Sequence, residues 1–337
     1  MSSATAFLNA RARALIGTVM PTPDILRLAE LPTVEAITRE LETTGYFRHK
    51  PGGEERFSPI QRLWNQLDED YRAAITVVNG AGRGVLRALY GEREAAFIKA
   101  TLGCVYRGIP PADRCRYTGG LHLLDRSKEA DLLEATDLAE AVERTPQRYR
   151  ATVQNALHRV EEEGSLFPME IGLDLFVLHE MWLAMRSLSR ADRIHVGALV
   201  GAQFDVYNVT AACRLREIFH VPSDETLGYL IHHGLYLFLS HRRALAGAES
   251  LAQIVAVVTK TPYEAFLRDA RTVADMERGM LRAFHHLLDV HLGGSPFHLG
   301  STVAYLFLKA TEIRNLTHVY EARRQDVKDI SLRDMML

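Results

Sequence analysis

The chain has 337 residues, of which 47% are hydrophobic and 24% are charged, and its formal net charge at pH 7 is -2. This apolar content supports a sizeable core, and the near-neutral charge argues against a nucleic-acid-binding protein, whose surface would be strongly basic. Cys104, Cys115 and Cys213 have no paired spacing, which indicates reduced thiols in a cytosolic protein and not a disulfide or zinc framework.

The sequence predicts neither a signal peptide nor a transmembrane helix. Arg11 and Arg13 interrupt the apolar run near the N-terminus. The uncharged segment 226–240 is too short to span a bilayer, and the segment 290–308 is broken by glycine and proline at 293–296. A role at a membrane would therefore depend on a protein partner.

Several helix starts are marked by a Ser or Thr that can cap the first turn, mostly with a proline directly after it. They are Thr33, Ser58 with Pro59, Thr145 with Pro146, and Thr261 with Pro262.

Apolar residues recur at helical spacing over most of the chain. The clearest segments are residues 6–19, 169–188, 191–219 and 273–292. The best strand candidate is 255–259, but Ser250 can cap this stretch as a short helix. The predicted fold class is all-α.

The C-terminal segment contains a pattern that recurs inside the chain. Glu312 and Asn315 are three residues apart, as are Asp205 and Asn208, and each pair leads into a basic stretch. A fainter third copy is Val77-Val78-Asn79, which leads to Arg83 and Arg87. The basic residues after the two clear copies are Arg214 and Arg216, and Arg323 and Arg324.

A second marker, a Thr shortly before a Tyr, recurs along the chain at a spacing similar to that of the acid and Asn pattern. It occurs at Thr44 with Tyr46, Thr145 with Tyr149, and Thr261 with Tyr263. No segment with the acid and Asn pattern precedes the first of these Thr-Tyr turns, and no Thr-Tyr turn follows the last segment with that pattern. Joining the two chain ends completes a third copy, which predicts three similar helical units in a closed ring.

The predicted ring gives boundaries for its three units and predicts one contact between the two ends of the chain. Within a single domain, 1–337, the units are approximately 1–70 plus 297–337, 71–190, and 191–296. Because both chain ends build one unit, the helix around 312–320 should lie against the first forty residues.

No catalytic constellation is apparent in the sequence. The glycine-rich stretch 80–84 lacks the Lys-Ser/Thr of a phosphate loop, and His179-Glu180 lacks the second histidine of a zinc protease. We expect no cofactor and no metal. The alternative that stays open is an all-α metal- or ligand-binding enzyme using the histidine-rich region around His232, His233, His285 and His286.

From end to end the chain resembles the C subunit of V/A-type ATPases (ATP synthases), the family that includes the d subunit of the eukaryotic V-ATPase. The most specific block is Glu312, Ile313, Arg314, Asn315 and Leu316. Weaker matches are Pro296 to Gly300, Ala304 to Leu306, Lys309, Asn9 to Leu15, Leu41 to Tyr46, and Tyr263. Residues 320–326 depart from the family pattern, which indicates a divergent member.

The resemblance implies a non-catalytic, funnel-like bundle of three helical units around a pseudo-threefold axis. It also implies a place in the central stalk, at the cytoplasmic face of the membrane. There the chain would link the central-shaft subunits to the membrane rotor ring and transmit torque for proton or sodium transport. Contact with the membrane would be indirect, through the ring.

A socket for the shaft should be polar and charged, because non-obligate interfaces rely on electrostatic complementarity. The candidate shaft-interface residues are Arg214, Arg216, Arg314, Arg323 and Arg324. The competing interpretation is that these arginines form salt bridges or lie on the solvated surface. Glu312, Ile313, Asn315, Leu316, Tyr46 and Tyr263 are expected to be structural.

Overall fold

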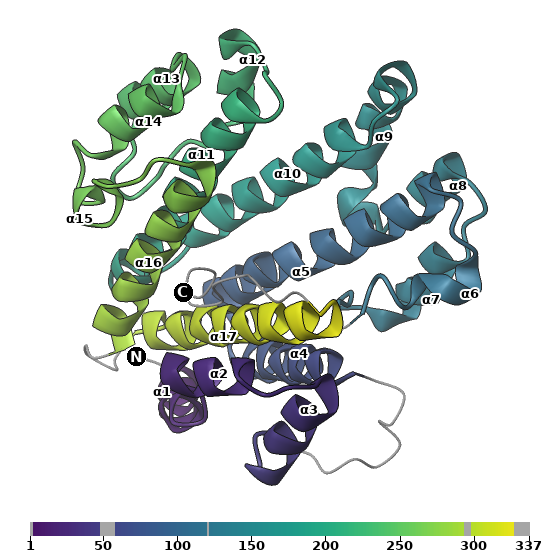
Figure 1. The fold of residues 1–337 in the computed structure, drawn as a ribbon, viewed down its shortest axis with the longest axis vertical. Helices are drawn as coiled ribbons and strands as arrows, with labels where there is room; N and C mark the ends of the chain where they lie inside the picture. Colours follow the sequence, from purple (N-terminus) through teal and green to yellow (C-terminus); the bar gives the residue numbers. More distant parts are fainter. Residues whose placement is uncertain (1–2, 48–57, 120, 293–297, 327–337) are drawn as a thin grey trace. The chain divides into compact units, whose positions relative to one another are not determined.

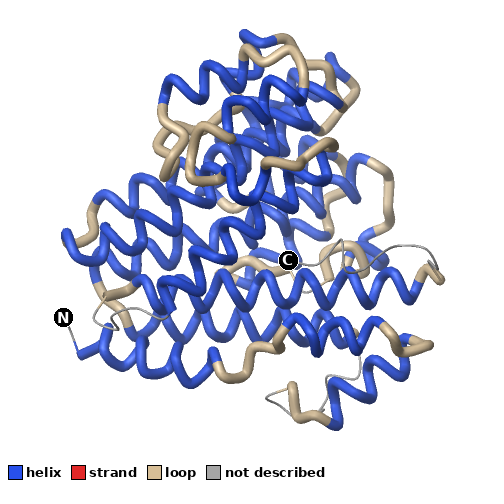
Figure 2. Tube along the Cα trace, turned by 60° about the vertical axis from the view of Figure 1, so that its left-hand side comes forward, coloured by secondary structure: helices blue, strands red, loops and turns tan. Residues whose placement is uncertain are grey.

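The computed structural model describes residues 3–47, 58–119, 121–292 and 298–326. Over these ranges the regular elements are helices, and no described residue forms a strand (Figure 2). The all-α prediction is confirmed. The predicted break at 293–296, and Pro296 and Phe297 of the family resemblance, lie outside the described residues.

The chain divides into two compact units. Unit 2 is residues 61–184, and unit 1 joins residues 1–60 to residues 185–337, so both ends of the chain belong to the same unit. The predicted division into three units is finer than this one and stays a prediction.

Within the described residues, unit 1 begins with three helices and continues, after unit 2, with seven more. The first three are α1 (Ser3–Ile16), α2 (Thr22–Ala29) and α3 (Val34–Thr43). The later ones are α11 (Arg190–Glu217), α12 (Ser223–Gly228), α13 (Leu239–Ala246), α14 (Leu251–Val258), α15 (Glu264–Leu267), α16 (Val273–Leu292) and α17 (Gly300–Arg324).

Unit 2 is built around two long helices and a set of shorter ones. These elements are α4 (Pro59–Val77), α5 (Gly80–Tyr106), α6 (Pro111–Arg114), η1 (Arg126–Lys128), α7 (Glu129–Leu133), α8 (Leu138–Arg144), α9 (Gln147–Glu163) and α10 (Phe167–Arg186). Helix α4 begins at Pro59, as its start signal predicts.

Two side-chain caps act as the sequence predicts. The Thr33 hydroxyl accepts a hydrogen bond from the backbone N–H of Ala36 at 3.2 Å and so caps α3. Ser250 accepts from the N–H of Gln253 at 3.4 Å and caps α14. The segment 251–258 is therefore a helix, and the strand alternative for it is wrong.

The Thr-Pro pairs do not cap the helices that follow them. The N-cap of α9 is Pro146, and the N-cap of α15 is Tyr263. Thr145 and Thr261 instead donate their hydroxyl hydrogens backwards, to the carbonyls of Ala141 and Val258. These carbonyls belong to the last turn of the preceding helix, where four acceptors lack helical partners.

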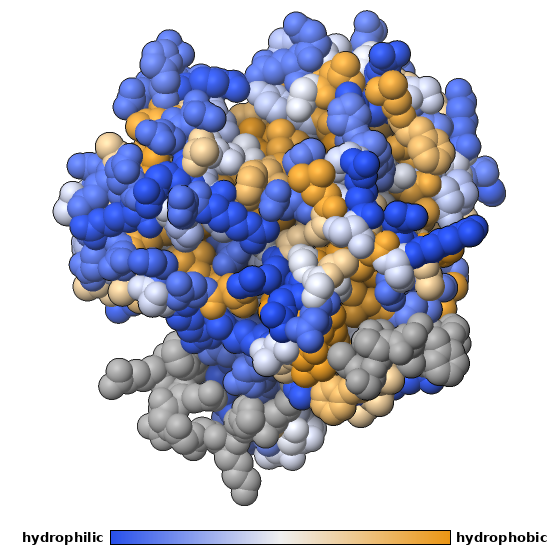
Figure 3. All heavy atoms as spheres, turned by 180° about the vertical axis from the view of Figure 1, so that it is seen from behind, coloured by the Kyte–Doolittle hydropathy of each residue, from blue (hydrophilic) through white to orange (hydrophobic). Residues whose placement is uncertain are grey.

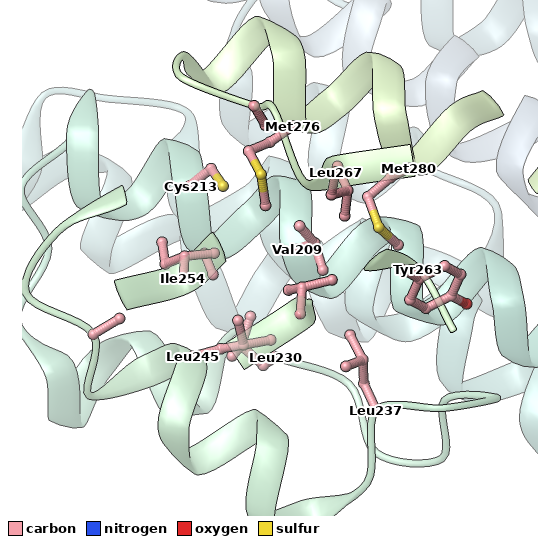
Figure 4. Packing of buried hydrophobic residues seen from close by; sticks show 14 of the residues in the cluster. Val209, Cys213, Leu230, Leu237, Leu245, Ile254, Tyr263, Leu267, Met276 and Met280 are labelled. Carbon is pink, nitrogen blue, oxygen red and sulfur yellow. The ribbon is translucent and has the colours of Figure 1, made fainter. Parts of the chain in front are cut away.

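The core of unit 1 lies where α11 packs against α14 and α16. Figure 4 shows side chains from these helices and from the segments between them meeting around Val209. The labelled residues include Cys213, Ile254, Met276 and Met280, all fully buried. Truncating such a side chain to alanine generally costs about 2 to 5 kcal/mol, because a cavity is left behind.

The two ends of the chain pack together within unit 1. Helix α17 contacts α1, α2 and α3, and Figure 1 shows it beside them. The side chain of Thr302 donates to Asn9 at 3.1 Å, and Arg323 donates to the carbonyl of Ala29 at 2.6 Å. The prediction that the last helix lies against the first forty residues is confirmed.

Candidate functional site

In the part of the chain that the structure describes, each of the three longest helices carries one buried acid whose carboxylate binds an irregular segment of the chain. We call these acids the long-helix carboxylates. They are Glu94 on α5, Asp205 on α11 and Glu312 on α17, with exposed fractions of 8%, 0% and 3%.

In unit 2, Glu94 accepts hydrogen bonds from three donors. The backbone N–H of Leu124 lies 2.9 Å from one carboxylate oxygen. The other oxygen accepts from the Tyr149 hydroxyl at 2.6 Å and from the Arg148 guanidinium at 3.1 Å. The carboxylate therefore fixes the segment before η1 and the start of α9 to the middle of α5.

In unit 1, Asp205 is held in a closely related way. It accepts from the backbone N–H groups of Tyr236 at 2.7 Å and Leu237 at 3.3 Å, and from the Tyr263 hydroxyl at 2.8 Å. Burial raises the pKa of Asp205 to about 6, although these hydrogen bonds act in the opposite direction.

Glu312 completes the set at the junction of the chain ends. Its carboxylate accepts from the backbone N–H of Met20 and pairs with Lys309 at 2.5 Å. Lys309 in turn donates to the Tyr46 hydroxyl at 2.7 Å, and its ammonium lies 4.4 Å from the centre of that ring. The tyrosine thus reaches this carboxylate through a lysine.

The three tyrosines belong to the Thr-Tyr markers of the sequence. In each marker the Thr hydroxyl donates to a carbonyl near the end of the preceding helix: Thr44 to Glu40 at 2.8 Å, Thr145 to Ala141 at 2.8 Å, and Thr261 to Val258 at 2.6 Å. The turn then delivers Tyr46, Tyr149 or Tyr263 to a long helix. The marker is therefore a helix-ending device.

Two of these phenols are fixed as hydrogen-bond donors by their surroundings. Burial, followed by the negative charge of Glu94, raises the pKa of Tyr149 above its usual range. Burial and Asp205 do the same to the pKa of Tyr263. Both hydroxyls consequently keep their proton at neutral pH.

The sequence pattern does not identify Glu94, and it puts the third copy of the repeat at residues 77–79 instead. Asn79 is not inside a long helix but at the N-cap of α5, where its side chain accepts from Arg83 at 2.7 Å. The third copy predicted at 77–79 is therefore wrong. Glu94, Asp205 and Glu312 recur at intervals of roughly 110 residues, and this spacing was the available signal.

The residue three positions after each carboxylate also differs among the three sites. Asn208 is fully buried and binds the backbone of Ile231 twice, donating to its carbonyl at 2.9 Å and accepting from its N–H at 2.7 Å. Asn315 is buried as well, but the matching position on α5 is Phe97, which has no polar group.

Each of the five candidate shaft-interface arginines has a partner within unit 1. Arg214 makes a bidentate contact with Glu277 of α16 at 2.6 and 3.0 Å, and Arg324 pairs with Glu321 at 2.6 Å. Arg216 donates to Ser223, Arg314 to Thr311, and Arg323 to the carbonyl of Ala29.

These arginines do not form one cluster. Figure 1 shows α11 leading towards α12, away from the C-terminal end of α17. Arg214 and Arg216 therefore lie apart from Arg323 and Arg324, whereas Arg314, Arg323 and Arg324 share α17. A role of any of them in a shaft contact stays a prediction.

The histidines of the alternative hypothesis lie in separate surroundings. The rings of His232 and His233 are 5.8 Å apart, between α12 and α13. On α16, His285 lies 3.5 Å from Asp289, and His286 packs beside the Phe266 ring. No group of three or more His, Cys, Asp or Glu side chains among the described residues is arranged to hold a metal ion.

The surface mixes hydrophilic side chains with exposed apolar ones (Figure 3). Phe238, Ile194 and Phe219 each expose more than half of their side chain. Within the described ranges, none of the helices combines the length and apolar character that crossing a bilayer requires.

Comparisons with known proteins place this architecture in a family. Residues 8–335 match the family described as the ATP synthase (C/AC39) subunit. The chain is 22% identical over 333 residues to the C subunit of the A-type ATP synthase of Methanothermobacter thermautotrophicus, covering 95% of this chain and 84% of the relative. The protein of the same name from Methanosphaera stadtmanae is 22% identical, with 98% and 86% covered. A third, from Methanobrevibacter smithii, is 23% identical, with 56% and 50% covered. The chain belongs to the ATP synthase (C/AC39) subunit family.

Proposed function

We propose that this chain is a subunit of a rotary ATPase or ATP synthase of the V/A type. The observation that carries the proposal is the family match over residues 8–335. The C subunits of A-type ATP synthases that align with nearly the whole chain also support it.

Within that complex we assign the chain to the central stalk, at the cytoplasmic face of the membrane. It links the central-shaft subunits to the membrane rotor ring without catalysing a reaction itself. Torque passes through it between ATP chemistry and the movement of protons or sodium ions.

The internal construction of unit 1 suits such a mechanical role. A part that transmits torque must be stiff, and closely packed interiors transmit strain because their compressibility is low. Helix α17 is buried along most of its length, and the Glu312–Lys309–Tyr46 contacts tie it to the N-terminal helices. The packing of α17 on α1, α2 and α3 therefore holds the two ends of the chain together within unit 1.

Arg314 is the best candidate for a polar contact with the shaft. It is exposed on the otherwise largely buried α17, whereas Arg323 is tied to α2 through the carbonyl of Ala29. Charged groups at a non-obligate interface steer association and fix register, so reversing the Arg314 charge should weaken shaft binding.

The test is a pull-down of the shaft subunits by wild-type chain and by Arg314→Glu. We expect weaker capture by the variant and a smaller loss of its capture when the salt concentration is raised. The matched control is Arg268→Glu, another exposed arginine of unit 1, which pairs locally with Glu264 at 3.3 Å. Equal, salt-insensitive capture by all three proteins would refute the assignment of Arg314 to the shaft contact.

A further inference from the structure

Asp205 differs from the other two long-helix carboxylates in one respect. Glu94 has the Arg148 guanidinium at 3.1 Å, and Glu312 has the Lys309 ammonium at 2.5 Å. Asp205 is the most buried of the three, yet the described residues provide it with no ion pair. Its partners are backbone N–H groups and one phenol.

What Asp205 holds is an irregular segment between α12 and α13, residues 230–237, which we call the strap. Asn208, one helical turn further along α11, binds the strap at Ile231. The N–H of Leu235 donates to the carbonyl of Gly201 at 3.1 Å. The two ends of the strap, Leu230 and Leu237, lie in the core shown in Figure 4.

The strap and the carboxylate are in direct van der Waals contact. A Cβ added to Gly234 would lie 1.7 Å from an Asp205 oxygen, and one added to Gly201 would lie 3.0 Å from the nitrogen of Leu235. The strap therefore covers Asp205 on one side, while Tyr263 contacts it from the turn before α15, and release of the strap would open that side of the carboxylate to water.

The charged and titratable groups around Asp205 do not neutralise it. Tyr236 lies on the strap, and Tyr263 lies on the turn before α15. From α13, Arg242 points its guanidinium at the carbonyl of Leu230 at 3.4 Å, and His232 and His233 lie on the strap near Arg242.

The other three helices packed on α11 offer no counter-charge either. Helix α14 contains no charged or titratable residue. The buried residues of α16 are apolar or glycine, and they include Met276, Met280 and Phe284. The buried ions of α17, Lys309 and Glu312, pair with each other.

We propose that Asp205 is a proton-binding site that sets how firmly the strap is held on α11, the neutral acid holding it more tightly than the carboxylate. Burying a charge without a cation is costly, so the closed strap favours the protonated form. The Tyr263 hydroxyl donates to the carboxylate and can accept from the acid, so this contact persists in both states.

The direction of the pH effect follows from linkage. The pKa of Asp205 is raised to about 6 when the strap is closed, whereas an Asp exposed to water has an ordinary value of 3.8. The closed form binds the proton more strongly, so closure is favoured at low pH and loses this contribution as pH rises through 6. The ends of the strap, Leu230 and Leu237, are buried in the core, so its release would expose apolar side chains.

Hydrogen exchange of the full chain tests this proposal. The protection of the Tyr236 and Leu237 amides is measured at pH 5 and pH 7.5, after correction for the intrinsic exchange rate. We expect about tenfold more opening at pH 7.5 in the wild type and no such change in Asp205→Asn. The control Glu94→Gln, in unit 2, should leave the pH response of the strap intact. A wild-type response that is absent, or that persists in Asp205→Asn, would overturn the proposal.

A direct titration keeps the proposal testable should Asp205→Asn fail to fold. With carbon-13-labelled aspartate in the wild-type chain, one side-chain carboxyl signal should titrate near pH 6. Tyr263→Phe should shift this titration and no other aspartate signal. A chain in which every aspartate titrates below pH 4.5 would contradict the assignment.

Discussion

Lys309 donates a hydrogen bond to the hydroxyl of Tyr46 across 263 residues of sequence. The same ammonium pairs with Glu312, so a cation, a carboxylate and a phenol from opposite ends of the chain form one group, with both ions buried. This contact closes unit 1. The Thr-Tyr turn at Tyr46 comes from the N-terminal end of the chain, and the long helix it contacts, α17, comes from the C-terminal end. The order of the sequence markers predicts this division.

Removal of the cation from this group should be strongly destabilising. In Lys309→Met, Glu312 stays buried without its counter-charge, and breaking a buried pair in this way generally costs about 3 to 5 kcal/mol. Urea unfolding followed by circular dichroism measures the loss. The control Arg324→Met removes the half-exposed pair with Glu321 and should cost about 1 kcal/mol or less. Equal losses in the two variants would show that the buried group is not a stability determinant.

The two direct phenol contacts should differ in strength. Tyr149→Phe leaves Glu94 with the Arg148 guanidinium and the Leu124 N–H, and should cost about 1 kcal/mol. Tyr263→Phe leaves Asp205 with backbone donors only, and at pH 7.5 the loss should be about 2 to 3 kcal/mol. Urea unfolding at that pH compares the two. A larger loss in Tyr149→Phe than in Tyr263→Phe would contradict the expectation that the Arg148 guanidinium compensates Glu94 for the lost phenol.

Acidification should destabilise unit 1 through His298. Its ring stacks on His195 with centroids 3.4 Å apart, and its Nδ1 accepts from the N–H of Gly300 at 3.1 Å. Burial, then the neighbouring His195 and His291, lower the pKa of His298 from 6.5 to about 4. Because the unfolded chain binds this proton more strongly, stability is full above pH 6.5 and is lost as pH falls towards 4.

The measurement for His298 needs an Asp205→Asn background, because Asp205 acts in the opposite direction over the same pH range. In that background the free energy of unfolding should be lower at pH 5 than at pH 7.5. His298→Asn, whose side-chain oxygen can replace Nδ1 as acceptor, should reduce this difference. An undiminished difference would assign the pH effect to other groups.

Gly234 should not tolerate a side chain, even though it is not buried. Gly234→Ala would place its Cβ 1.7 Å from the Asp205 carboxylate, so the strap would have to shift. We expect a loss of about 2 kcal/mol or more, as for other overpacked sites. Gly228→Ala is the control, because nothing lies within 4 Å of its added Cβ. Thermal unfolding midpoints of the two variants check this, and equal midpoints would contradict the contact described for the strap.

The sequence predicted those features that depend on local spacing. The Thr33 cap, the start of α4 at Pro59 and the helical segments follow from the pattern of side chains within a few residues. The contact between the chain ends could be predicted as well, because the repeat markers are incomplete at both ends and complement each other.

The features that sequence reasoning missed depend on contacts between distant segments. Glu94 lacks the Asn that follows the other two carboxylates, so nothing near it in sequence marks it as their equivalent. The pairs Thr145-Pro146 and Thr261-Pro262 predict caps, but a Thr-Pro pair is compatible with both a helix start and a helix end. The strap has no periodic pattern, and its backbone is fixed by Asp205 and Asn208, which precede it by more than twenty residues.

The most direct test of the central claim is an electron cryomicroscopy structure of the ATPase complex purified from membranes through a tag on this chain. We expect density for this chain on the rotor axis, between the central shaft and the membrane ring. A complex in which the chain occupies a peripheral stalk, or from which shaft and ring subunits are absent, would contradict it.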